Sequence, residues 1–405
     1  MKTFITGMGA VSSLGTNVET MFRALLENKS GVRHFPEWEK YNGLHCHLGG
    51  PAPEYDIMKI PRSARRTMSR MSEMSVLAVM EAAGQADLQI GSQKSTPRIA
   101  LVLGSTTGSP ENLEIYFKKL IERGGPEGQM GTTFFKVMSH SVVANVASAL
   151  EFKGPVLSPA SACATSAQAM IMGWEMLQTG LYDIVIAGGA DELHYTSCAV
   201  FDVVMAASRG YNNSSQTSPR PFDKKRDGLV VAEGASVVVM ESEDSLKRRG
   251  VRPLARFLGG AYHCDGSHMS QSSRPAMFEV MSMALERAGQ KSSDVGYLNA
   301  HATATVQGDQ EESEAIADLF GDRVPVSSLK GHFGHSLAAC GTLEAIASVE
   351  MMRRGVILPT RNLEEIDPAC ARIRHVREIT NSKIRTVMSN NFAFGGMNTS
   401  LLLSL

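Results

Sequence analysis

Hydrophobic residues along the chain fall into two kinds of segment that differ in length and period. Short apolar runs that end in glycine are typical of buried strands, and residues 183–191 contain one such run. Longer segments carry apolar or small side chains three and four positions apart, as at residues 164–177, which is the period of one helical face. The two kinds of segment alternate along most of the chain. We therefore expect an α/β protein whose sheets are mainly parallel and covered by helices.

The alternation of strands and helices begins anew near residue 251. A strand at residues 4–13 opens the chain, and a strand at residues 254–262 opens a second series. We therefore predict two similar halves, residues 1–250 and residues 251–405. The prediction rests on the order of the elements alone, because the halves share too little sequence identity to prove a repeat.

Composition and charge exclude several classes of protein. The chain has 405 residues, 43% of them hydrophobic, which is enough for two domains with large cores. Its formal net charge of -1 offers no electrostatic attraction to nucleic acid or to an anionic membrane. No apolar run approaches the roughly 18 residues of a membrane span, and early glycines interrupt any signal peptide. We therefore expect a cytoplasmic protein without a membrane span and without a nucleic-acid partner.

The cysteines and histidines show no metal-binding motif. Six cysteines are scattered without Cys-x-x-Cys spacing, so neither a disulfide framework nor a zinc ribbon is predicted. In His45-Cys46-His47 an extended chain would point the cysteine away from both histidines, which favours surface or hydrogen-bonded histidines. The pair Gly7 and Gly9 lacks the third glycine of a dinucleotide-binding loop. We therefore predict no bound metal and no dinucleotide.

One cysteine stands in a setting that favours chemistry. Cys163 follows the apolar strand at residues 155–157 and precedes the helical segment, and small residues on both sides leave its sulfur accessible. The unpaired N–H groups and the positive dipole of a helix N-terminus stabilise a thiolate, so we expect a lowered pKa and a nucleophile. The alternative is a small buried side chain, which is the commonest role of a free cysteine.

Two histidines occupy similar positions in the second half. His301 ends the apolar strand at residues 295–300, and His335 stands where another strand gives way to a helix. A third strand ends in the glycine turn of residues 388–398. A lone histidine at a strand end is more often a structural residue, but in parallel α/β folds ligands and catalytic groups collect at strand ends. We therefore expect both histidines to converge with Cys163.

A basic run precedes one of the expected helices. Arg62, Arg66 and Arg70 repeat every fourth residue, with Arg65 beside them, and would share one helical face. Such a stripe is either a solvated helix face or a docking surface for an acidic protein or a phosphate group.

Five stretches taken together resemble one family, the β-ketoacyl-(acyl carrier protein) synthases, which are the condensing enzymes of fatty-acid and polyketide synthesis within the thiolase superfamily. The resemblance runs essentially end to end and is closest to the ketosynthase I and II branch. The matching stretches are Ser161-Ala-Cys163-Ala-Thr-Ser166, His301-Ala-Thr303-Ala-Thr305 with Gly308-Asp309, Lys330 before Gly334-His335, Asn391-Phe-Ala-Phe-Gly-Gly396, and Arg220-Pro-Phe-Asp223 with Arg226-Asp227-Gly228 and Glu233-Gly234.

The resemblance implies a fold and a reaction. The fold is a thiolase-like five-layer αβαβα sandwich made of two similar halves, ordinarily assembled as a homodimer. Cys163 would accept an acyl chain as a thioester from acyl carrier protein, and malonyl carrier protein would then lose carbon dioxide and condense with that chain. The phosphopantetheine arm arrives on the carrier protein, so no resident cofactor is implied.

The same resemblance assigns roles around the cysteine. His301 and His335 would hydrogen-bond the thioester oxygen as the enolate forms, with His335 neutral and donating from Nε2. The oxyanion of the condensation step would be held by the backbone N–H groups of Cys163 and Phe394.

Further residues match supporting positions of the family. Lys330 and Glu312 match a pair that orients the histidines and balances charge. The other matches are Thr303 and Thr305 for the phosphopantetheine arm, Phe392 and Phe394 for the gate over the acyl pocket, and Arg62, Arg65, Arg66 and Arg70 for docking of the carrier protein.

The chain departs from the family pattern at Ala302 and Ala393, which replace glycines, and at His332, which is an additional histidine. These departures favour a specialised branch, such as one that makes polyunsaturated or aryl polyene chains. Two other classes are open to test. A coenzyme A-dependent thiolase would need a second cysteine at the C-terminal glycine turn, and a non-catalytic partner of a ketosynthase heterodimer would lack Cys163. An active chain in a heterodimer is also compatible with the sequence.

Overall fold

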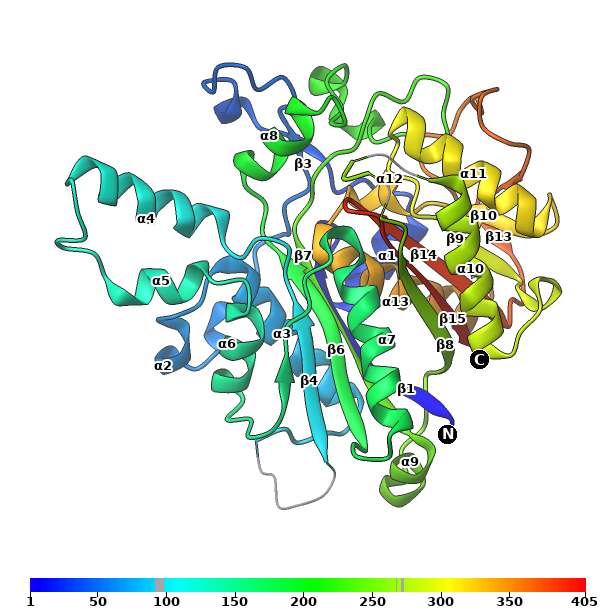
Figure 1. Ribbon diagram of the computed structural model, residues 1–405, viewed down its shortest axis with the longest axis horizontal. Coiled ribbons are helices and arrows are strands. Elements are labelled where there is room, and N and C mark those ends of the chain that lie inside the picture. The colour runs from blue at the N-terminus through cyan, green and yellow to red at the C-terminus, as the bar shows by residue number, and fades with distance from the viewer. Residues whose placement is uncertain (92–97, 267, 271–272) are drawn as a thin grey trace.

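The computed structural model describes residues 1–91, 98–266, 268–270 and 273–405 (Figure 1). Both halves of the chain contain strands. The strands are β1 (Thr3–Ser12), β2 (Arg33–His34), β3 (Leu48–Gly49), β4 (Ile99–Gly104), β5 (Val156–Leu157), β6 (Ile184–Asp191), β7 (Gly234–Ser242), β8 (Ala255–Cys264), β9 (Tyr297–Asn299), β10 (Pro325–Ser327), β11 (Val356–Ile357), β12 (Arg374–His375), β13 (Thr380–Asn381), β14 (Thr386–Ala393) and β15 (Met397–Ser404). Eleven of them form one mixed sheet in the order β12-β10-β9-β14-β15-β8-β1-β7-β6-β4-β5.

Helices connect most of these strands. The α-helices are α1 (Val18–Leu26), α2 (Arg62–Arg65), α3 (Arg70–Gln85), α4 (Pro110–Glu122), α5 (Gly131–Val137), α6 (Ser141–Ala149), α7 (Thr165–Gln178), α8 (Tyr195–Val203), α9 (Glu243–Arg249), α10 (Arg274–Ala288), α11 (Val306–Phe320), α12 (Lys330–Phe333) and α13 (Cys340–Arg354). The 3-10 turns are η1 (Pro36–Trp38), η2 (Ile57–Lys59), η3 (Ala162–Ala164), η4 (Asn212–Thr217), η5 (Ser292–Asp294) and η6 (Leu337–Ala339). Within the described ranges, no helix combines the length and the apolar character needed to cross a membrane.

The strand order of the first half recurs in the second. In β5-β4-β6-β7-β1 the strands lie in the order third, second, fourth, fifth and first along the chain, and β10-β9-β14-β15-β8 repeats that order. The directions also agree, because the first three strands of each set pair in parallel and the last two pair antiparallel. Residues 3–5 of β1 pair with residues 255–257 of β8 and join the two sets. The fold is therefore built from two similar halves; the division at residue 250 stays a prediction.

Helices separate the two halves of the sheet into layers. Helix α7 packs against β4, β6 and β7 on one side and against β8 and β15 on the other, and α13 packs against β7, β14 and α7. Helices α3 and α10 cover the outer faces of the two halves. Figure 1 shows the succession from left to right as outer helices, first half-sheet, central helices, second half-sheet and outer helices. This is the expected five-layer αβαβα arrangement.

The central layer explains the composition of its helices. Every residue of α13 from Cys340 to Met352 is buried, because the helix touches neighbours on all sides. Such a helix has no solvent face, so its apolar residues are not confined to one stripe. The two central helices begin close together, since η3 before α7 contacts η6 before α13. Their common end becomes the floor of the site described below.

The arginine repeat does not form one helical face. Helix α2 ends at Arg65 and α3 begins at Arg70, with residues 66–69 between them. Thr67 Oγ1 donates to Asn145 Oδ1 at 2.7 Å, and Asn145 Nδ2 donates to the Thr67 carbonyl at 3.2 Å. These bonds to α6 hold the chain in a turn, and the predicted single stripe is wrong.

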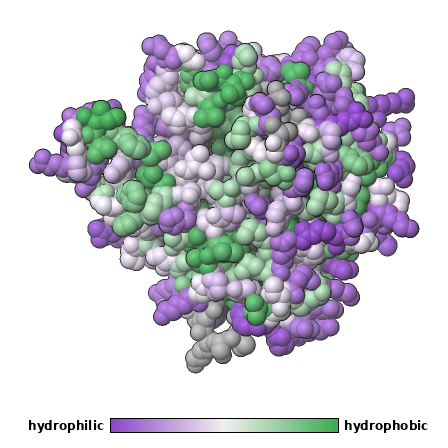
Figure 2. Space-filling model, viewed as in Figure 1, coloured by the Kyte–Doolittle hydropathy of each residue, from purple (hydrophilic) through white to green (hydrophobic). Residues whose placement is uncertain are grey.

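An arm made of α4 and α5 projects from the body of the molecule (Figure 1). It carries apolar side chains that are about half exposed or more, visible as green surface at the upper left of Figure 2. These side chains are Phe117, Ile121, Met130, Phe134 and Phe135. The two residues of the edge strand β5, Val156 and Leu157, are also exposed.

Candidate active site

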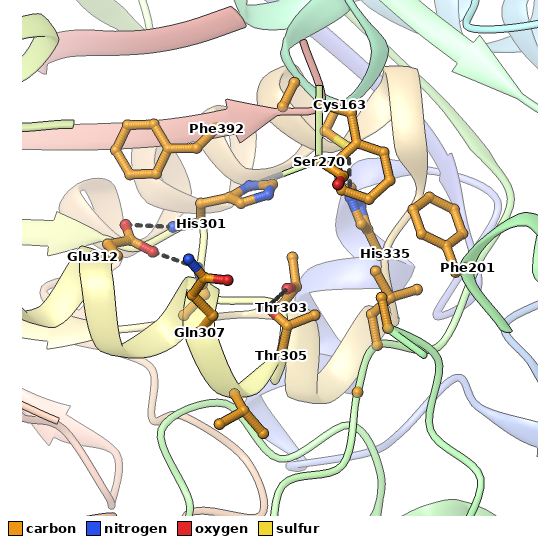
Figure 3. A pocket seen from close by; sticks show the side chains of 18 of the residues that line it. Cys163, Phe201, Ser270, His301, Thr303, Thr305, Gln307, Glu312, His335 and Phe392 are labelled. Carbon is orange, nitrogen blue, oxygen red and sulfur yellow. Dashed lines mark hydrogen bonds between the residues drawn. The ribbon is translucent and has the colours of Figure 1, made fainter. Parts of the chain in front are cut away.

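Three side chains from separate elements meet at one cavity (Figure 3). Cys163 lies in η3, His301 follows β9 and His335 follows α12. One sulfur or nitrogen atom of each lies within 4.8 Å of those of the other two. The cavity has a volume of about 370 Å³, and its lining also includes Thr303, Thr305, Phe392 and Phe394. The structure thus brings together the three side chains that the sequence singled out.

Cys163 sits in a strained turn rather than at the first turn of the α-helix. It belongs to η3, and α7 begins only at Thr165. Ala162 has a φ of +47°, which is unfavourable for a residue with a side chain. Thr165 holds this turn, because its Oγ1 donates to the Ala162 carbonyl at 2.8 Å and accepts from the Ser161 N–H at 2.9 Å.

The expected lowering of the Cys163 pKa is wrong for the resting site. Burial raises the pKa of the Cys163 thiol to about 12, although Lys330 acts in the opposite direction. The side chain is only 6% exposed, so the loss of hydration outweighs the nearby positive charge. The sequence indicated the helix end correctly but contained no measure of how deeply the turn is buried.

His335 is oriented toward the sulfur by its other ring nitrogen. Its Nδ1 accepts from the Leu337 N–H at 3.3 Å, so the proton of a neutral ring resides on Nε2. Nε2 lies 2.9 Å from Cys163 Sγ and donates to it. Burial, followed by the Lys330 ammonium, holds the pKa of His335 well below its ordinary range. The ring is therefore a neutral donor and cannot accept the thiol proton at Nε2.

The backbone before His335 requires glycine. Gly334 has a φ of +76°, and a Cβ added there would lie 2.9 Å from the Val230 carbonyl oxygen. The His335 N–H donates to that carbonyl at 2.7 Å, and the His335 carbonyl accepts from Ala232 N–H at 2.8 Å. This close pairing with residues 230–232 fixes the histidine over the cavity.

His301 is held by its backbone and leaves its ring available. Glu312 on α11 accepts the His301 N–H at 2.9 Å and the Ala302 N–H at 2.6 Å. The ring lies edge-on to His335 with centroids 5.4 Å apart, and its Nδ1 is buried without a hydrogen-bond partner among the described residues. Burial, Lys330 and His335 together hold the pKa of His301 well below its usual value. Both histidines are therefore neutral.

Lys330 pairs with a carboxylate that the sequence did not indicate. Its Nζ donates to Glu344 Oε1 at 2.5 Å, whereas Glu312 accepts the backbone N–H groups of residues 301 and 302. Burial alone would lower the pKa of Lys330, but Glu344 raises it above the ordinary value. The other oxygen of Glu344 accepts from Asn391 Nδ2 at 2.9 Å and from Asn299 Nδ2 at 3.3 Å.

Lys330 and Glu312, which the sequence grouped as a supporting pair, interact through charge, but the hydrogen-bonded partner of Lys330 is Glu344. Glu344 lies on α13, whereas Glu312 lies on α11 and is bonded to the backbone of His301 (Figure 3). A possible signal was present in the sequence, because Glu344 is an acidic residue in the middle of a helix of small and apolar side chains. Without knowledge of the central helix layer, however, the sequence was equally consistent with an exposed Glu344.

The mouth of the cavity is polar on one wall and aromatic on the other. Thr303 and Thr305 lie side by side with their hydroxyl oxygens 3.1 Å apart (Figure 3). Phe392 lies within 6.1 Å of the His301 ring, measured between centroids, and is buried. Phe394 packs on Phe201 at 5.6 Å between centroids and is 36% exposed. The mouth is therefore bordered by one buried and one accessible phenyl ring.

The four arginines differ in their surroundings. Arg70 donates from Nε and Nη2 to Glu233 at 2.9 and 2.6 Å, and Glu233 is buried. Arg62 and Arg66 are exposed and Arg65 is half-buried. Arg70 is thus bonded to a buried carboxylate although its side chain is 38% exposed, whereas Arg62, Arg65 and Arg66 form no ion pair within the described residues.

Comparison with known proteins agrees with this geometry. The family model described as Beta-ketoacyl synthase, N-terminal domain, matches residues 2–245, and the one described as Beta-ketoacyl synthase, C-terminal domain, matches residues 254–364. The chain belongs to the β-ketoacyl synthase family.

Relatives of known name match the chain over its full length. It is 35% identical to the 3-oxoacyl-[acyl-carrier-protein] synthase 1 of Escherichia coli (strain K12), over 99% of this chain and 98% of that protein. The crystal structure of a β-ketoacyl synthase from Burkholderia phymatum STM815 matches with a TM-score of 0.95 and 39% identity, over 100% of this chain and 99% of that one. The ishigamide ketosynthase/chain length factor matches with a TM-score of 0.91 and 28% identity, over 100% of this chain and 98% of that one.

Proposed function

We propose that the protein is an acyltransferase that joins malonyl groups to an acyl chain, both delivered on acyl carrier protein, in fatty-acid or polyketide elongation. The observation that carries this proposal is the 2.9 Å contact between Cys163 Sγ and the protonated Nε2 of a neutral His335, with His301 beside them. A thiol next to two neutral donors suits thioester exchange and enolate formation in one cavity. The chemistry is a decarboxylative Claisen condensation.

In the first step Cys163 takes the acyl chain. Its sulfur attacks the thioester carbonyl, the bond to the carrier's phosphopantetheine sulfur breaks, and that sulfur leaves with the proton that Cys163 has lost. The resting thiol has a raised pKa, so the anion must be stabilised as it forms. The Nε2–H of His335 and the nearby Lys330 ammonium supply that stabilisation, and no external base is needed.

In the second step malonyl carrier protein enters the same cavity. The bond to its carboxylate breaks, carbon dioxide leaves, and the electron pair forms an enolate whose oxygen receives hydrogen bonds from His301 and His335. Neutral imidazoles donate without transferring a full proton, which suits an anion that must react onward. The enolate carbon attacks the acyl carbonyl, and the N–H groups of Cys163 and Phe394 hold the resulting oxyanion. The Cys163 sulfur then leaves, and the β-ketoacyl chain remains on the carrier.

Other residues support delivery of the substrates. We assign Thr303 and Thr305 to the phosphopantetheine arm, because their hydroxyls line the polar wall of the mouth. Phe392 and Phe394 would gate the acyl chain. Glu312 and Lys330 would position the histidines, the former through the His301 backbone and the latter through charge. The carrier protein supplies the only prosthetic group that this reaction requires.

Carrier docking is assigned to the exposed arginines. Acyl carrier proteins are acidic, so Arg62, Arg65 and Arg66 offer complementary charge. Arg70, which the sequence placed in the same set, is bonded to Glu233 and would act through the fold instead.

We further propose that two copies of the chain associate through β5 and the arm of α4 and α5. The edge strand has exposed residues Val156 and Leu157 and no further strand beside it in the described part of the chain. The arm exposes apolar side chains that a second copy would cover. Light scattering of the purified chain should give twice its 43.7 kDa mass, and Val156→Asp should give the monomer. A monomeric wild-type chain would favour a heterodimer with another subunit.

The rival classes fit the site less well. A thiolase would need a second reactive cysteine, but Cys340 is buried, its pKa lies well above the ordinary value, and its S–H donates to the Cys163 carbonyl at 3.1 Å. A non-catalytic partner subunit would not require Cys163, His301 and His335, which all line the cavity.

The test is intact-protein mass spectrometry after mixing with carrier proteins loaded with acyl chains of different lengths. We expect an added acyl mass on the wild-type chain and none on Cys163→Ala, with the yield ranking the chain lengths. Absence of any adduct in a folded dimeric sample would contradict the proposal.

A further inference from the structure

A second group of metal-ligating side chains lies outside the active site, in the N-terminal segment that contains β2, η1 and β3. One ligand atom from each of His34, Glu39 and His47 lies within 4.8 Å of those of the other two. None of the three lines the active-site cavity. Two imidazoles and one carboxylate form a donor set that Zn²⁺ and related divalent ions accept.

The backbone places the two histidines next to each other. Strands β2 and β3 pair antiparallel, with His34 opposite Leu48, and the Phe35 N–H donates to the His47 carbonyl at 2.8 Å. The His47 N–H is itself held by Asn212 Oδ1 at 2.9 Å. The main chain of both residues is therefore fixed before any ligand arrives, which favours binding.

The carboxylate is brought to the same point by η1. The aromatic rings of Phe35, which precedes this turn, and Trp38 stack with centroids 4.4 Å apart, and the Glu39 N–H donates to the Pro36 carbonyl. Glu39 Oε1 thereby lies 3.4 Å from His34 Nε2. Two ligand atoms about 2.1 Å from a tetrahedral zinc ion are separated by about 3.4 Å, so this spacing suits a shared metal.

The ring nitrogens have the partners expected of metal ligands. His47 Nε2 donates to the Leu44 carbonyl at 2.9 Å, which leaves the Nδ1 lone pair free. A backbone carbonyl that fixes the tautomer in this way is the usual companion of a metal-bound histidine. His34 Nε2 is buried and, among the residues that the structure describes, has no hydrogen bond but lies beside Glu39.

We propose that His34, Glu39 and His47 bind a divalent transition-metal ion of the zinc type, with water completing its coordination. Glu39 is 58% exposed, so the ion can enter from solvent. The sequence pointed to His45-Cys46-His47 and rejected a metal there; the structure brings His47 close to His34 instead, and Cys46 is buried.

The ion would stabilise a segment that packs against α8, the helix that contributes Phe201 to the lining of the active-site cavity. The segment between Leu44 and His47 contacts α8, because the His45 N–H donates to Asp202 Oδ2 at 2.6 Å and Cys198 S–H donates to the Cys46 carbonyl at 3.4 Å. Helix α8 also carries Phe201, which lines the cavity. Metal binding should therefore raise the thermal stability of the protein without supplying any catalytic group.

The test must separate this site from Cys163, His301 and His335, whose atoms are equally close together. We would titrate Zn²⁺ into Cys163→Ser protein, which lacks the sulfur ligand, in competition with a chromophoric chelator. We expect one bound equivalent and a raised melting temperature. His34→Gln and Glu39→Gln should each weaken binding at least tenfold and abolish the thermal shift. Co²⁺ should give visible tetrahedral bands without a sulfur charge-transfer band.

His45→Gln is the matched control, because His45 is exposed and adjacent to His47 in sequence but lies outside the trio. It should bind Zn²⁺ as tightly as the parent. Each variant would first be compared with the parent in chelator by circular dichroism, to exclude misfolding. No bound equivalent in the parent, or equal affinity after His34→Gln and Glu39→Gln, would overturn the proposal.

Discussion

A buried ion pair lies near the cysteine and both histidines. Lys330 and Glu344 are both 1% exposed, and each is the principal charged partner of the other. Two charges in such surroundings lose their hydration, and only the short contact and the amides of Asn299 and Asn391 offset that loss. The pair keeps a cation near Cys163 and both histidines, which holds the histidines neutral and opposes the burial of the thiol.

Removing one member of this pair should be costly. We predict that Glu344→Ala lowers the free energy of unfolding by about 3–5 kcal/mol, because it leaves the Lys330 ammonium buried and unpaired. Urea unfolding at neutral pH measures the change.

Glu350→Ala is the control for that measurement. Glu350 lies on the same helix and is also buried, but its partners Arg353 and Arg354 are 39% and 37% exposed. Because these arginines keep contact with water when the carboxylate is removed, we expect a loss of only about 1 kcal/mol there. Equal losses at the two positions would show that the buried Lys330–Glu344 pair contributes no more to the free energy of unfolding than the pairs of Glu350.

At the scale of elements, the site is made by short turns that end strands or begin helices. The turn before α7 presents Cys163, the end of β9 presents His301, and the glycine after α12 presents His335. Each turn is fixed by hydrogen bonds to its neighbours rather than by its own length. Small changes in backbone position are therefore expected to affect the chemistry.

Gly334→Ala tests this dependence. The added Cβ would meet the Val230 carbonyl at 2.9 Å in a left-handed conformation, so His335 must move. We predict a loss of condensation of about a hundredfold or more, measured with acyl and malonyl carrier proteins, because displacement by 1 Å has that effect on a positioned group.

Gly289→Ala is the matched control. Gly289 has a similar φ of +64° but open space around it. It should cost about 1–2 kcal/mol of stability and leave the rate of condensation unchanged. A similar loss of activity in both variants would mean that strain, and not the position of His335, is responsible.

Strands and turns whose ends are marked by small residues were predictable from the sequence. The residues that contact them from distant parts of the fold were not. Cys163, His301 and His335 each follow an apolar run that ends in small residues, so their convergence could be inferred. Glu344 could not, because its partner lies 14 residues away and the burial of α13 follows only from the central layer. The break between Arg65 and Arg70 has no glycine or proline and depends on Asn145.

At the scale of the whole molecule, burial sets the protonation of groups far from the cavity. His375 on β12 packs on Phe222 with centroids 4.8 Å apart, and neither ring nitrogen has a hydrogen-bond partner within the part of the chain that the structure describes. Burial, assisted by Arg377, lowers the pKa of His375 to about 4. In the unfolded chain the same group titrates near 6.5.

This difference makes stability depend on pH. Between about pH 6.5 and pH 4 the unfolded chain binds a proton that the folded chain refuses, so the contribution of His375 to stability is lost as the pH falls. Buried carboxyls act in the opposite sense, because burial raises the pKa of Glu312 to about 8 and that of Glu192 to about 7. The contribution of His375 is therefore best measured as the difference in free energy of unfolding between the wild type and a variant that lacks this histidine.

We predict that His375→Gln gains about 2 kcal/mol of stability relative to the wild type as the pH is lowered from 6.5 to 4.5. Urea unfolding of both chains across that range measures the difference. A constant difference at all pH values would mean that His375 titrates normally in the folded chain.

The separate roles of Cys163 and His301 are tested most directly by measuring loading of the cysteine and condensation as two steps. Wild-type and His301→Ala chains would be acylated with the same carrier protein, then mixed with malonyl carrier protein, and the acyl mass on Cys163 and the carbon dioxide released would be followed with time. We predict that His301→Ala loads normally but discharges at least about a hundredfold more slowly, since it lacks a donor to the enolate. Discharge of both chains at the same rate would contradict the division of roles between the cysteine and the histidines.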